Sequence, residues 1–290
     1  MIQIESNHFS LLIKYRIDLT IVKFRKIVKL SLPAGLSNWI QRIKIKKENT
    51  TLRLLEDDYP WMSPNIWNEI VNFYRHLDSP VIVEFGTGAS TINHFFEMTK
   101  LEKAKYIGIE NDPSWFWLVV ASLLNKSQKM GIDCDIKMNH REQSNNFQGY
   151  VDVEMNFNNV IFLLRLRTSE SEYFAAFDKL CDVIVIDGIA RKQCVQMILH
   201  SDYLRNGGLM ILMEAGRGSD RWWEGKLYGD SDYSKEVELL LSLGGEFLDG
   251  NGVDNWPNCK RKSPRPTSYY CPLEACKLIK PSKRVPDEIH

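Results

Sequence analysis

The sequence predicts an α/β fold built on a doubly wound, mostly parallel sheet. Short apolar runs of strand length recur along the chain, and helical segments separate them, which is the pattern of a parallel sheet covered by helices. The first run leads directly into Gly86-Thr87-Gly88, a glycine turn between a strand and a helix. Open sheets of this kind bind nucleotide-like ligands at the carboxyl ends of their strands.

The first strand, Val81–Phe85, and its glycine turn predict the charge of the ligand. Glycines let the backbone turn sharply and approach a ligand closely. Glu84 stands beside the turn, where a carboxylate repels the pyrophosphate of a dinucleotide but suits the ammonium and sulfonium groups of S-adenosylmethionine. Thr91 occupies the position of the third glycine in the dinucleotide fingerprint. The turn therefore favours the methyl donor over NAD.

Later runs are expected to place further acids at the same edge of the sheet. The strand Tyr106–Glu110 ends in Glu110, whose two oxygens are expected to accept hydrogen bonds from both ribose hydroxyls. Two more runs, 182–188 and 207–214, predict later strands that end near Asp187 and Glu214. Several acids are thus expected around one cleft.

The remaining elements are predicted from apolar spacing. Ile132–Met138 is the expected third strand, whereas Val160–Leu166 departs from the simple alternation and is either an inserted strand or part of a helix. The expected helices are Pro64–Tyr74, Ala89–Thr99, Pro113–Lys126, Arg191–Leu204 and Tyr233–Leu243.

With these residues, the chain resembles the class I S-adenosylmethionine-dependent methyltransferases, which are Rossmann-like. The resemblance covers roughly residues 59–276 and rests on Glu84-x-Gly86-x-Gly88-x-Ser90, Glu110, Asp187-Gly188 and the turn Leu204-Arg205-Asn206-Gly207-Gly208. Three further stretches are similar to a bacterial-type group of this class with unassigned acceptors: Pro60-Trp61, residues 110–115 and residues 187–194.

The resemblance implies a seven-stranded sheet whose last two strands form an antiparallel hairpin. Residues 245–248 and Thr267–Cys271 are the candidates for that hairpin. It also implies S-adenosyl-L-methionine as the cofactor. The residues expected to bind the cofactor are Glu84, Phe85, Gly86, Thr87, Gly88, Ser90, Thr91, Glu110, Asn111, Asp187 and Gly188.

The catalytic residues are predicted from the chemistry of methyl transfer. Transfer from a sulfonium is an in-line displacement, so the protein has mainly to align the reactants and exclude water. A hydroxyl acceptor also needs a base, and Asp187 and Glu214 are the available carboxylates. The same two acids would be the ligands of a divalent cation, but Glu214-Ala215-Gly216 lacks the acid–amide pair of the catechol-type relatives, so no metal is expected.

Four residues are candidates for acceptor binding. Arg191 and Arg217 suit an anionic acceptor, with pairing to a local acid as the alternative for each. Trp222 and Trp223 suit stacking on a sugar ring or an aromatic acceptor, with packing of a lid or hairpin as the alternative.

Composition limits the possible partners. The 290 residues contain 37 Lys+Arg and 37 Asp+Glu, so the chain lacks the net positive field that grips nucleic acid. The base-amino methyltransferase tetrapeptide, N-P-P-Y or D-P-P-Y, is absent as well. Six cysteines occur without any C-x-x-C spacing, which favours free thiols and a reducing cytoplasm over zinc or disulfides. A small-molecule or saccharide acceptor is therefore expected, and no nucleic acid.

Residues 1–47 are predicted to form a basic, helical extension to the methyltransferase domain of residues 48–290. This segment contains ten Lys/Arg and only two acidic residues. Ile13, Ile17, Ile21 and other apolar residues recur at the spacing of one helix face. The stripe predicts a helix that packs on the domain or forms a dimer. The alternative is peripheral contact of residues 1–30 with an anionic membrane. Charges interrupt every apolar run, so neither a membrane span nor a secretory signal is expected.

The sequence as a whole predicts a cytoplasmic S-adenosylmethionine-dependent methyltransferase that acts on a hydroxyl of a small or saccharide-like acceptor. Two alternatives stay open at this point. One is an NAD-dependent oxidoreductase or epimerase, which Glu84 and Thr91 disfavour. The other is a non-catalytic binding protein that keeps the methyltransferase fold.

Overall fold

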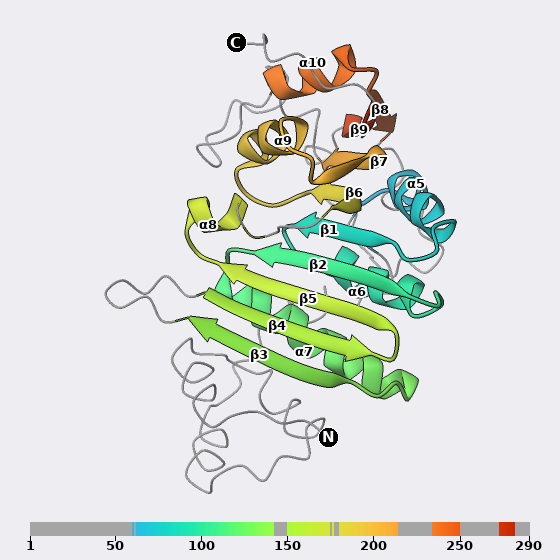
Figure 1. Ribbon diagram of the computed structural model, residues 1–290, viewed down its shortest axis with the longest axis vertical. Coiled ribbons are helices and arrows are strands. Elements are labelled where there is room, and N and C mark those ends of the chain that lie inside the picture. The colour runs from blue at the N-terminus through green and yellow to red at the C-terminus, as the bar shows by residue number, and fades with distance from the viewer. Residues whose placement is uncertain are drawn as a thin grey trace, which may run out of the picture.

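The described part of the chain forms one twisted sheet with helices on both faces (Figure 1). The computed structural model describes residues 60, 62–141, 150–174, 176, 180–213, 234–249 and 273–281. Within them the sheet has nine strands in the order β3-β4-β5-β2-β1-β6-β7-β9-β8. The α/β class predicted from the sequence is confirmed, while the expected count of seven strands is wrong because two strands are added at one edge.

Five parallel strands make the centre of the sheet. Their neighbours pair in parallel, and the register places Glu84 of β1 between Gly108 of β2 and Val185 of β6. Both faces of these strands are covered, so they consist of almost continuous apolar runs. The five strands are β1 (Val81–Phe85), β2 (Ala104–Glu110), β5 (Val160–Arg167), β6 (Cys181–Ile186) and β7 (Leu204–Met213).

The hairpin expected after the parallel strands is present, with one strand displaced in sequence. The strand β9 (Leu273–Ile279) lies antiparallel between β7 and β8 (Glu246–Asp249). The first hairpin strand therefore starts where the sequence predicted it. The second begins after the candidate Thr267–Cys271, which lies outside the described residues.

The helices divide into two groups, each with its own apolar core. On one face lie α5 (Pro64–Arg75), α6 (Ala89–Met98) and α7 (Pro113–Met130). On the other face lie α8 (Glu170–Phe174), α9 (Arg191–Leu199) and α10 (Ser234–Ser242). Figure 1 shows α6 and α7 behind the strands and α8 and α9 on the opposite side.

Local signals explain where the longest helix begins and ends. The Asp112 carboxylate accepts a hydrogen bond from the Trp115 amide at 2.9 Å, and Pro113 occupies the first turn of α7. Gly131 ends the helix with φ of +68°, a left-handed conformation that glycine adopts without strain. No helix in the described part of the chain is long and apolar enough to cross a membrane.

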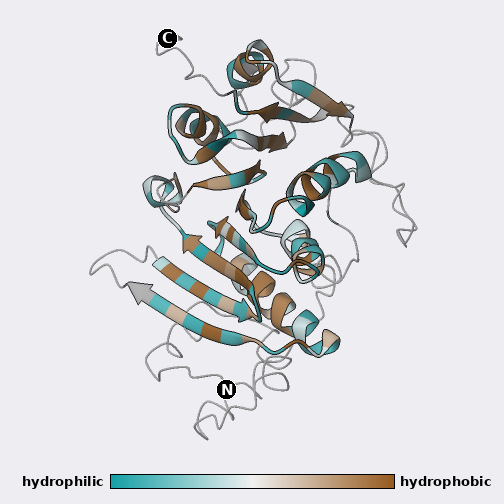
Figure 2. Cartoon of the chain, turned by 45° about the vertical axis from the view of Figure 1, so that its right-hand side comes forward, coloured by the Kyte–Doolittle hydropathy of each residue, from teal (hydrophilic) through white to brown (hydrophobic). Residues whose placement is uncertain are grey.

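The edge next to β5 differs from the prediction. Val160–Arg167 is the parallel neighbour of β2 and thus the true third strand of the parallel set, not a helix segment. The expected third strand is instead β3 (Asp135–Arg141), which pairs only with β4 (Tyr150–Phe157) in an antiparallel meander. The physical reason is that β5 carries apolar side chains on both faces, whereas β3 and β4 bury one face only. Figure 2 shows this as alternating teal and brown bands along β3 and β4.

Other boundaries shift by a few residues. Helix α9 ends at Leu199 instead of Leu204, because Leu204 already pairs with Cys181 as the first residue of β7. The extension of residues 1–47 lies outside the described residues, so its helix and its packing stay predictions.

Candidate functional site

The glycine turn after β1 lies against the turn after β6. Gly86 has φ of +89°, and a Cβ placed there would come within 2.6 Å of the Gly188 Cα. The Gly86 amide donates to the Ile109 carbonyl at 2.8 Å, and the Asp187 amide donates to the Phe85 carbonyl at 2.8 Å. Glycine is therefore required at both positions, because the two backbones touch.

Every backbone N–H of the turn is already used within the chain. The Gly86 amide donates to β2, the Thr87 amide donates to Glu110 Oε2 at 3.0 Å, and the Gly88 amide donates to Thr91 Oγ1 at 2.9 Å. A pyrophosphate-binding turn instead points such N–H groups at the ligand. The three amides of this turn are therefore not available to bind a dinucleotide pyrophosphate.

Gly88 is the glycine that protein packing leaves open. A Cβ built on it would meet only the Trp115 indole, at 3.7 Å and 3.8 Å, which is ordinary van der Waals distance. Its φ of −177° is extended backbone that other residues adopt as well. The Trp115 indole N–H donates to the Thr87 carbonyl and so lies over the turn. None of the described protein contacts therefore requires a glycine at this position.

Glu110 lies at the carboxyl end of β2, as predicted, and joins two turns. Its Oε2 accepts hydrogen bonds from the Thr87 amide at 3.0 Å and hydroxyl at 3.2 Å. Its Oε1 accepts from the amides of Asn111, at 2.8 Å, and Asp112, at 2.9 Å. Burial raises the pKa of Glu110, and these hydrogen bonds act in the opposite direction. The carboxylate is thus held in a fixed place at the strand end.

Glu84 lies deeper than the sequence suggested. Its side chain is fully buried beneath the turn, on the face that α6 covers, and it accepts hydrogen bonds from the hydroxyls of Ser90, Thr91 and Tyr106. Burial raises the pKa of Glu84 to about 8, and the charges of Asp187 and Glu110 act in the same direction. The carboxylate therefore faces hydroxyl groups of the protein.

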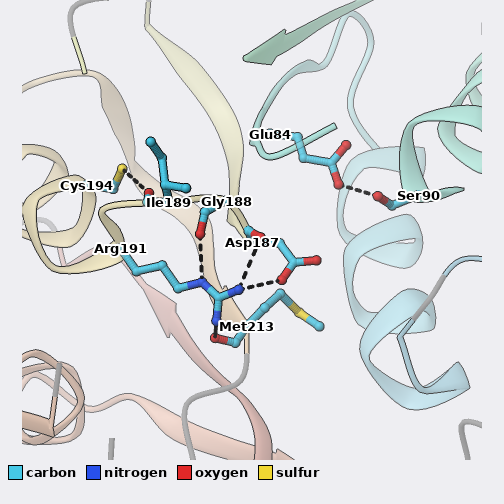
Figure 3. Close-up of polar contacts among 8 residues, drawn as sticks. All are labelled: Glu84, Ser90, Asp187, Gly188, Ile189, Arg191, Cys194 and Met213. Atoms are coloured by element: carbon cyan, nitrogen blue, oxygen red, sulfur yellow. Dashed lines mark hydrogen bonds and ion pairs between the residues drawn. The ribbon is translucent and has the colours of Figure 1, made fainter. Parts of the chain in front are cut away.

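Asp187 and Arg191 form a second cluster, at the end of β6 (Figure 3). The Arg191 guanidinium donates to Asp187 Oδ1 at 3.1 Å, to the Asp187 carbonyl at 3.1 Å and to the Gly188 carbonyl at 3.1 Å. It also reaches the Met213 carbonyl at 3.2 Å, which ties the ends of β6 and β7 together. The alternative weighed for Arg191, pairing with a local acid, is thus what the structure shows. Asp187 keeps 35% of its side chain exposed at the strand ends.

The other predicted cofactor residues lie in three places around the turn. Ser90 and Thr91 lie in the first turn of α6, where their hydroxyls face Glu84 and not the open side of the turn. Phe85 is fully buried and packs on the Tyr173 ring, with centroids 5.5 Å apart, so it supports the turn from below. Asn111 contributes its backbone amide to Glu110.

Two tyrosines at the site were not predicted from the sequence. Tyr106 is fully buried and lies on the same face of β2 as Glu110, which the two-residue period of a strand could have revealed. Tyr173 comes from α8, a helix that the sequence analysis did not predict. Its hydroxyl is buried without a hydrogen-bond partner, and a Cβ on Gly188 would overlap it. Burial raises the pKa of Tyr173 well above its ordinary value.

The described residues fit a cationic adenosine ligand. Three carboxylates, those of Glu84, Glu110 and Asp187, lie at or beneath the strand ends, and the open Gly88 backbone leaves room for close approach. Among the described residues no group of three or more His, Cys, Asp or Glu could hold a metal ion. The remaining candidates, Glu214, Arg217, Trp222 and Trp223, lie outside the described residues.

Comparisons with known proteins place methyltransferases among the similar structures. No protein-family model and no curated protein matches the chain. A proposed O-methyltransferase from Klebsiella pneumoniae is 14% identical with a TM-score of 0.46, over 85% of this chain and 96% of that one. A cofactor-bound protein from Mycobacterium tuberculosis is 11% identical with a TM-score of 0.47, over 87% and 99%. A proposed caffeoyl-CoA O-methyltransferase from Staphylococcus aureus is 17% identical with a TM-score of 0.42, over 74% and 92%.

The strand arrangement itself agrees with the resemblance drawn from the sequence. Seven of the nine strands form the order β5-β2-β1-β6-β7-β9-β8, in which β9 alone runs in the direction opposite to the other six. The antiparallel closing hairpin is the feature that the resemblance implied. The chain therefore has the Rossmann-like fold of the class I S-adenosylmethionine-dependent methyltransferases, with a β3–β4 addition at one edge.

Proposed function

We propose that the protein is an S-adenosylmethionine-dependent methyltransferase. The observation that carries the proposal is a glycine turn whose three amides are all engaged within the chain and which has the carboxylates of Glu110 and Asp187 beside it at the strand ends. The amides of such a turn are not available to an anion, and the two acids beside it suit the ammonium and sulfonium groups of the methyl donor. NAD carries a pyrophosphate and is disfavoured for the same reason.

Three residues at the turn then have specific roles in binding the cofactor. Glu110 is the proposed acceptor for the ribose hydroxyls because its carboxylate ends β2 beside the turn, and these hydroxyls would have to share its oxygens with the four hydrogen bonds that it already accepts. Gly88 lets the ligand approach the backbone, and Trp115 borders it there. The bound cofactor supplies a methyl group on a sulfonium, and the chain has to orient the acceptor against it.

We also propose that the acceptor is a hydroxyl and that Asp187 takes its proton. Asp187 is the partly exposed carboxylate beside the turn, and Arg191 fixes its orientation through Oδ1. A base held in one orientation by a hydrogen bond can meet the acceptor proton without reorganising. A small or saccharide-like acceptor stays the proposal for the substrate class, with Glu214, Arg217, Trp222 and Trp223 as candidates to contact it.

Equilibrium dialysis of the full chain against S-adenosylmethionine and against NAD tests the cofactor. We expect saturable binding of S-adenosylmethionine and of its product S-adenosylhomocysteine, and none of NAD. Saturable binding of NAD together with no binding of either sulfur ligand would overturn the proposal.

The base is tested with methyl-labelled S-adenosylmethionine and a panel of hydroxylated small molecules and sugars. Asp187→Asn should lower transfer to any accepted hydroxyl by about 100-fold or more, the range of a general base, and should lower S-adenosylhomocysteine affinity far less. If Asp187→Asn turns over at the wild-type rate, Asp187 is not the general base, and the cofactor assignment is unaffected.

A further inference from the structure

Glu84 lies behind the glycine turn, and the role inferred for it rests on the proposed function. Figure 3 shows the Glu84 carboxylate pointing to Ser90 at the start of α6 and away from the Asp187 cluster. Oε1 accepts from the Ser90 hydroxyl, while Oε2 accepts from Thr91 Oγ1 at 2.8 Å and from the Tyr106 hydroxyl. Glu84 has no exposed surface. Three hydroxyls of the protein thus occupy the position where a ligand cation would be expected.

Thr91 connects this buried carboxylate to the turn. Its Oγ1 donates to Glu84 and accepts the backbone N–H of Gly88 at 2.9 Å, and the Tyr106 hydroxyl lies 3.0 Å from the same oxygen. A continuous series of hydrogen bonds therefore runs from β2 through β1 and α6 to Gly88. Because it ends on a backbone N–H, this series fixes the orientation of the peptide plane on which the ligand is expected to lie.

Tyr106 is placed to hold the carboxylate and is too deep to touch a ligand. Its side chain is fully buried, and its ring stacks on Phe162 with centroids 4.8 Å apart. Gly108, which faces Glu84 in the strand register, leaves room for it, since a Cβ there would come within 3.1 Å of the Tyr106 ring and 2.6 Å of the Thr87 methyl group. The ring is thus fixed by packing, with its hydroxyl directed at Glu84.

We propose that Glu84, Thr91 and Tyr106 are positioning residues that set the Gly88 backbone, and that Glu84 does not contact the methyl donor. The two acids beside the turn then differ in role. Glu110 meets the ligand at the strand end, whereas Glu84 acts from behind the turn through the Thr91 hydroxyl.

A pair of ligands separates positioning from direct contact. S-adenosylhomocysteine and its desamino analogue, which lacks the α-ammonium group, are titrated into the wild type and into Glu84→Gln. If Glu84 positions the turn, Glu84→Gln should raise the Kd of both ligands by the same factor, about tenfold for one disrupted hydrogen-bond series. If Glu84 pairs with the ammonium, the loss should appear with S-adenosylhomocysteine and vanish with the analogue, and the proposal fails.

Tyr106→Phe tests the far end of the network against a matched control. It removes only the hydroxyl and keeps the ring on Phe162, and it should raise the Kd of both ligands about as much as Glu84→Gln, with no further rise in the double variant. Tyr74→Phe is the control, because Tyr74 is equally buried on the same side but its hydroxyl contacts His94 Nδ1 at 3.3 Å and not the turn. Wild-type affinity is expected for Tyr74→Phe.

Further outcomes are also decisive. Equal affinities of Tyr106→Phe and Tyr74→Phe would overturn the positioning role while leaving the proposed function intact. If Tyr106→Phe does not fold, Thr91→Val interrupts the same series next to Gly88 and should give the same rise in Kd. A wild type that binds neither ligand would refute the proposed function, and the positioning proposal with it.

Discussion

The centre of the sheet and its β3–β4 edge are held together by different means. At the centre, the ends of β1 and β6 meet backbone to backbone at Gly86 and Gly188, and buried hydrogen bonds fix the turn between them. At the edge, the strands are joined across their polar face by ion pairs such as Arg167–Asp152, at 2.7 Å, and Lys137–Glu154, at 3.5 Å. If the proposed function is right, ligand binding depends on the centre, where Gly86 and Gly188 admit no side chain, whereas the edge contributes to stability.

The largest effect is expected from adding one carbon at the centre. Gly86→Ala should cost at least about 3 kcal/mol, because the new Cβ would meet the Gly188 backbone within 2.6 Å. Gly131→Ala is the matched control, since Gly131 also has a positive φ, +68°, but has nothing within 4 Å of its ideal Cβ. It should cost only about 1 kcal/mol. Thermal unfolding measures both, and equal losses would show that packing at the strand ends is not the cause.

Removal of an edge carboxylate should lower stability without lowering affinity. Asp152→Ala leaves Arg167, which is 2% exposed and lies 3.5 Å from the centroid of the Tyr150 ring, without its carboxylate. We expect a loss of about 2–4 kcal/mol in the free energy of unfolding, since an unpaired buried charge is costly. The Kd for S-adenosylhomocysteine should stay within about twofold of the wild-type value. A tenfold weaker affinity at unchanged stability would contradict the division between centre and edge.

Glu110→Ala should reduce ligand affinity more than it reduces stability, the reverse of the result expected for Asp152→Ala. It removes the proposed acceptor for the ribose hydroxyls and should weaken S-adenosylhomocysteine binding by about 1–3 kcal/mol, the range of hydrogen bonds to a charged group. Isothermal titration gives the value. An unchanged Kd would mean that the ligand does not reach the end of β2.

Two buried titratable groups at the centre predict opposite pH responses. Glu84 has a folded pKa of about 8 against 4.5 ordinarily, so its contribution to stability is fully present below pH 4.5 and is lost as the pH rises towards 8. Burial lowers the pKa of His94 from 6.5 to about 3, so its contribution is present above pH 6.5 and is lost as the pH falls towards 3. Denaturant unfolding of wild type and Glu84→Gln at pH 5 and pH 9 isolates the first group. The wild type should lose stability relative to the variant at pH 9, and an equal difference at both pH values would contradict the assignment.

The smallest effect is expected at an exposed position of the edge. Lys137 keeps 72% of its side chain exposed, so its ion pair with Glu154 is screened by solvent. Lys137→Ala should change neither stability, beyond about 0.5 kcal/mol, nor affinity. Thermal unfolding and titration check both quantities, and a loss above 1 kcal/mol would indicate that the edge is more tightly coupled than its exposure suggests.

The centre of the sheet could be predicted from the sequence because two constraints act on its residues. One is the sequence pattern at the strand ends, and the other is the parallel pairing of the strands. An apolar run, a glycine turn and a terminal acid occur together at β1, and a run ending in an acid recurs at β2 and β6. Parallel pairing then brings these ends to one edge of the sheet. The positions of Glu110 and Asp187 followed from this pattern alone.

The edge and the depth of Glu84 could not be predicted in the same way. An apolar run such as Val160–Arg167 has no periodicity that separates a buried strand from a helix, and the alternation in β4 does not say which strand it pairs with. The pattern also does not say whether Glu84 faces the ligand or the helix behind the turn. That depended on Tyr106 and Thr91, which come from β2 and α6 and meet Glu84 only in the folded chain.

The central claim, that the methyl donor lies on the Gly88 backbone, is tested most directly by titrating S-adenosylhomocysteine into the wild type and Gly88→Ala. The new methyl group meets no protein atom closer than 3.7 Å, so the melting temperature should stay the same. The Kd should rise at least about tenfold, because the methyl group occupies the space of the ligand. An unchanged Kd in a fully folded Gly88→Ala variant would contradict the claim.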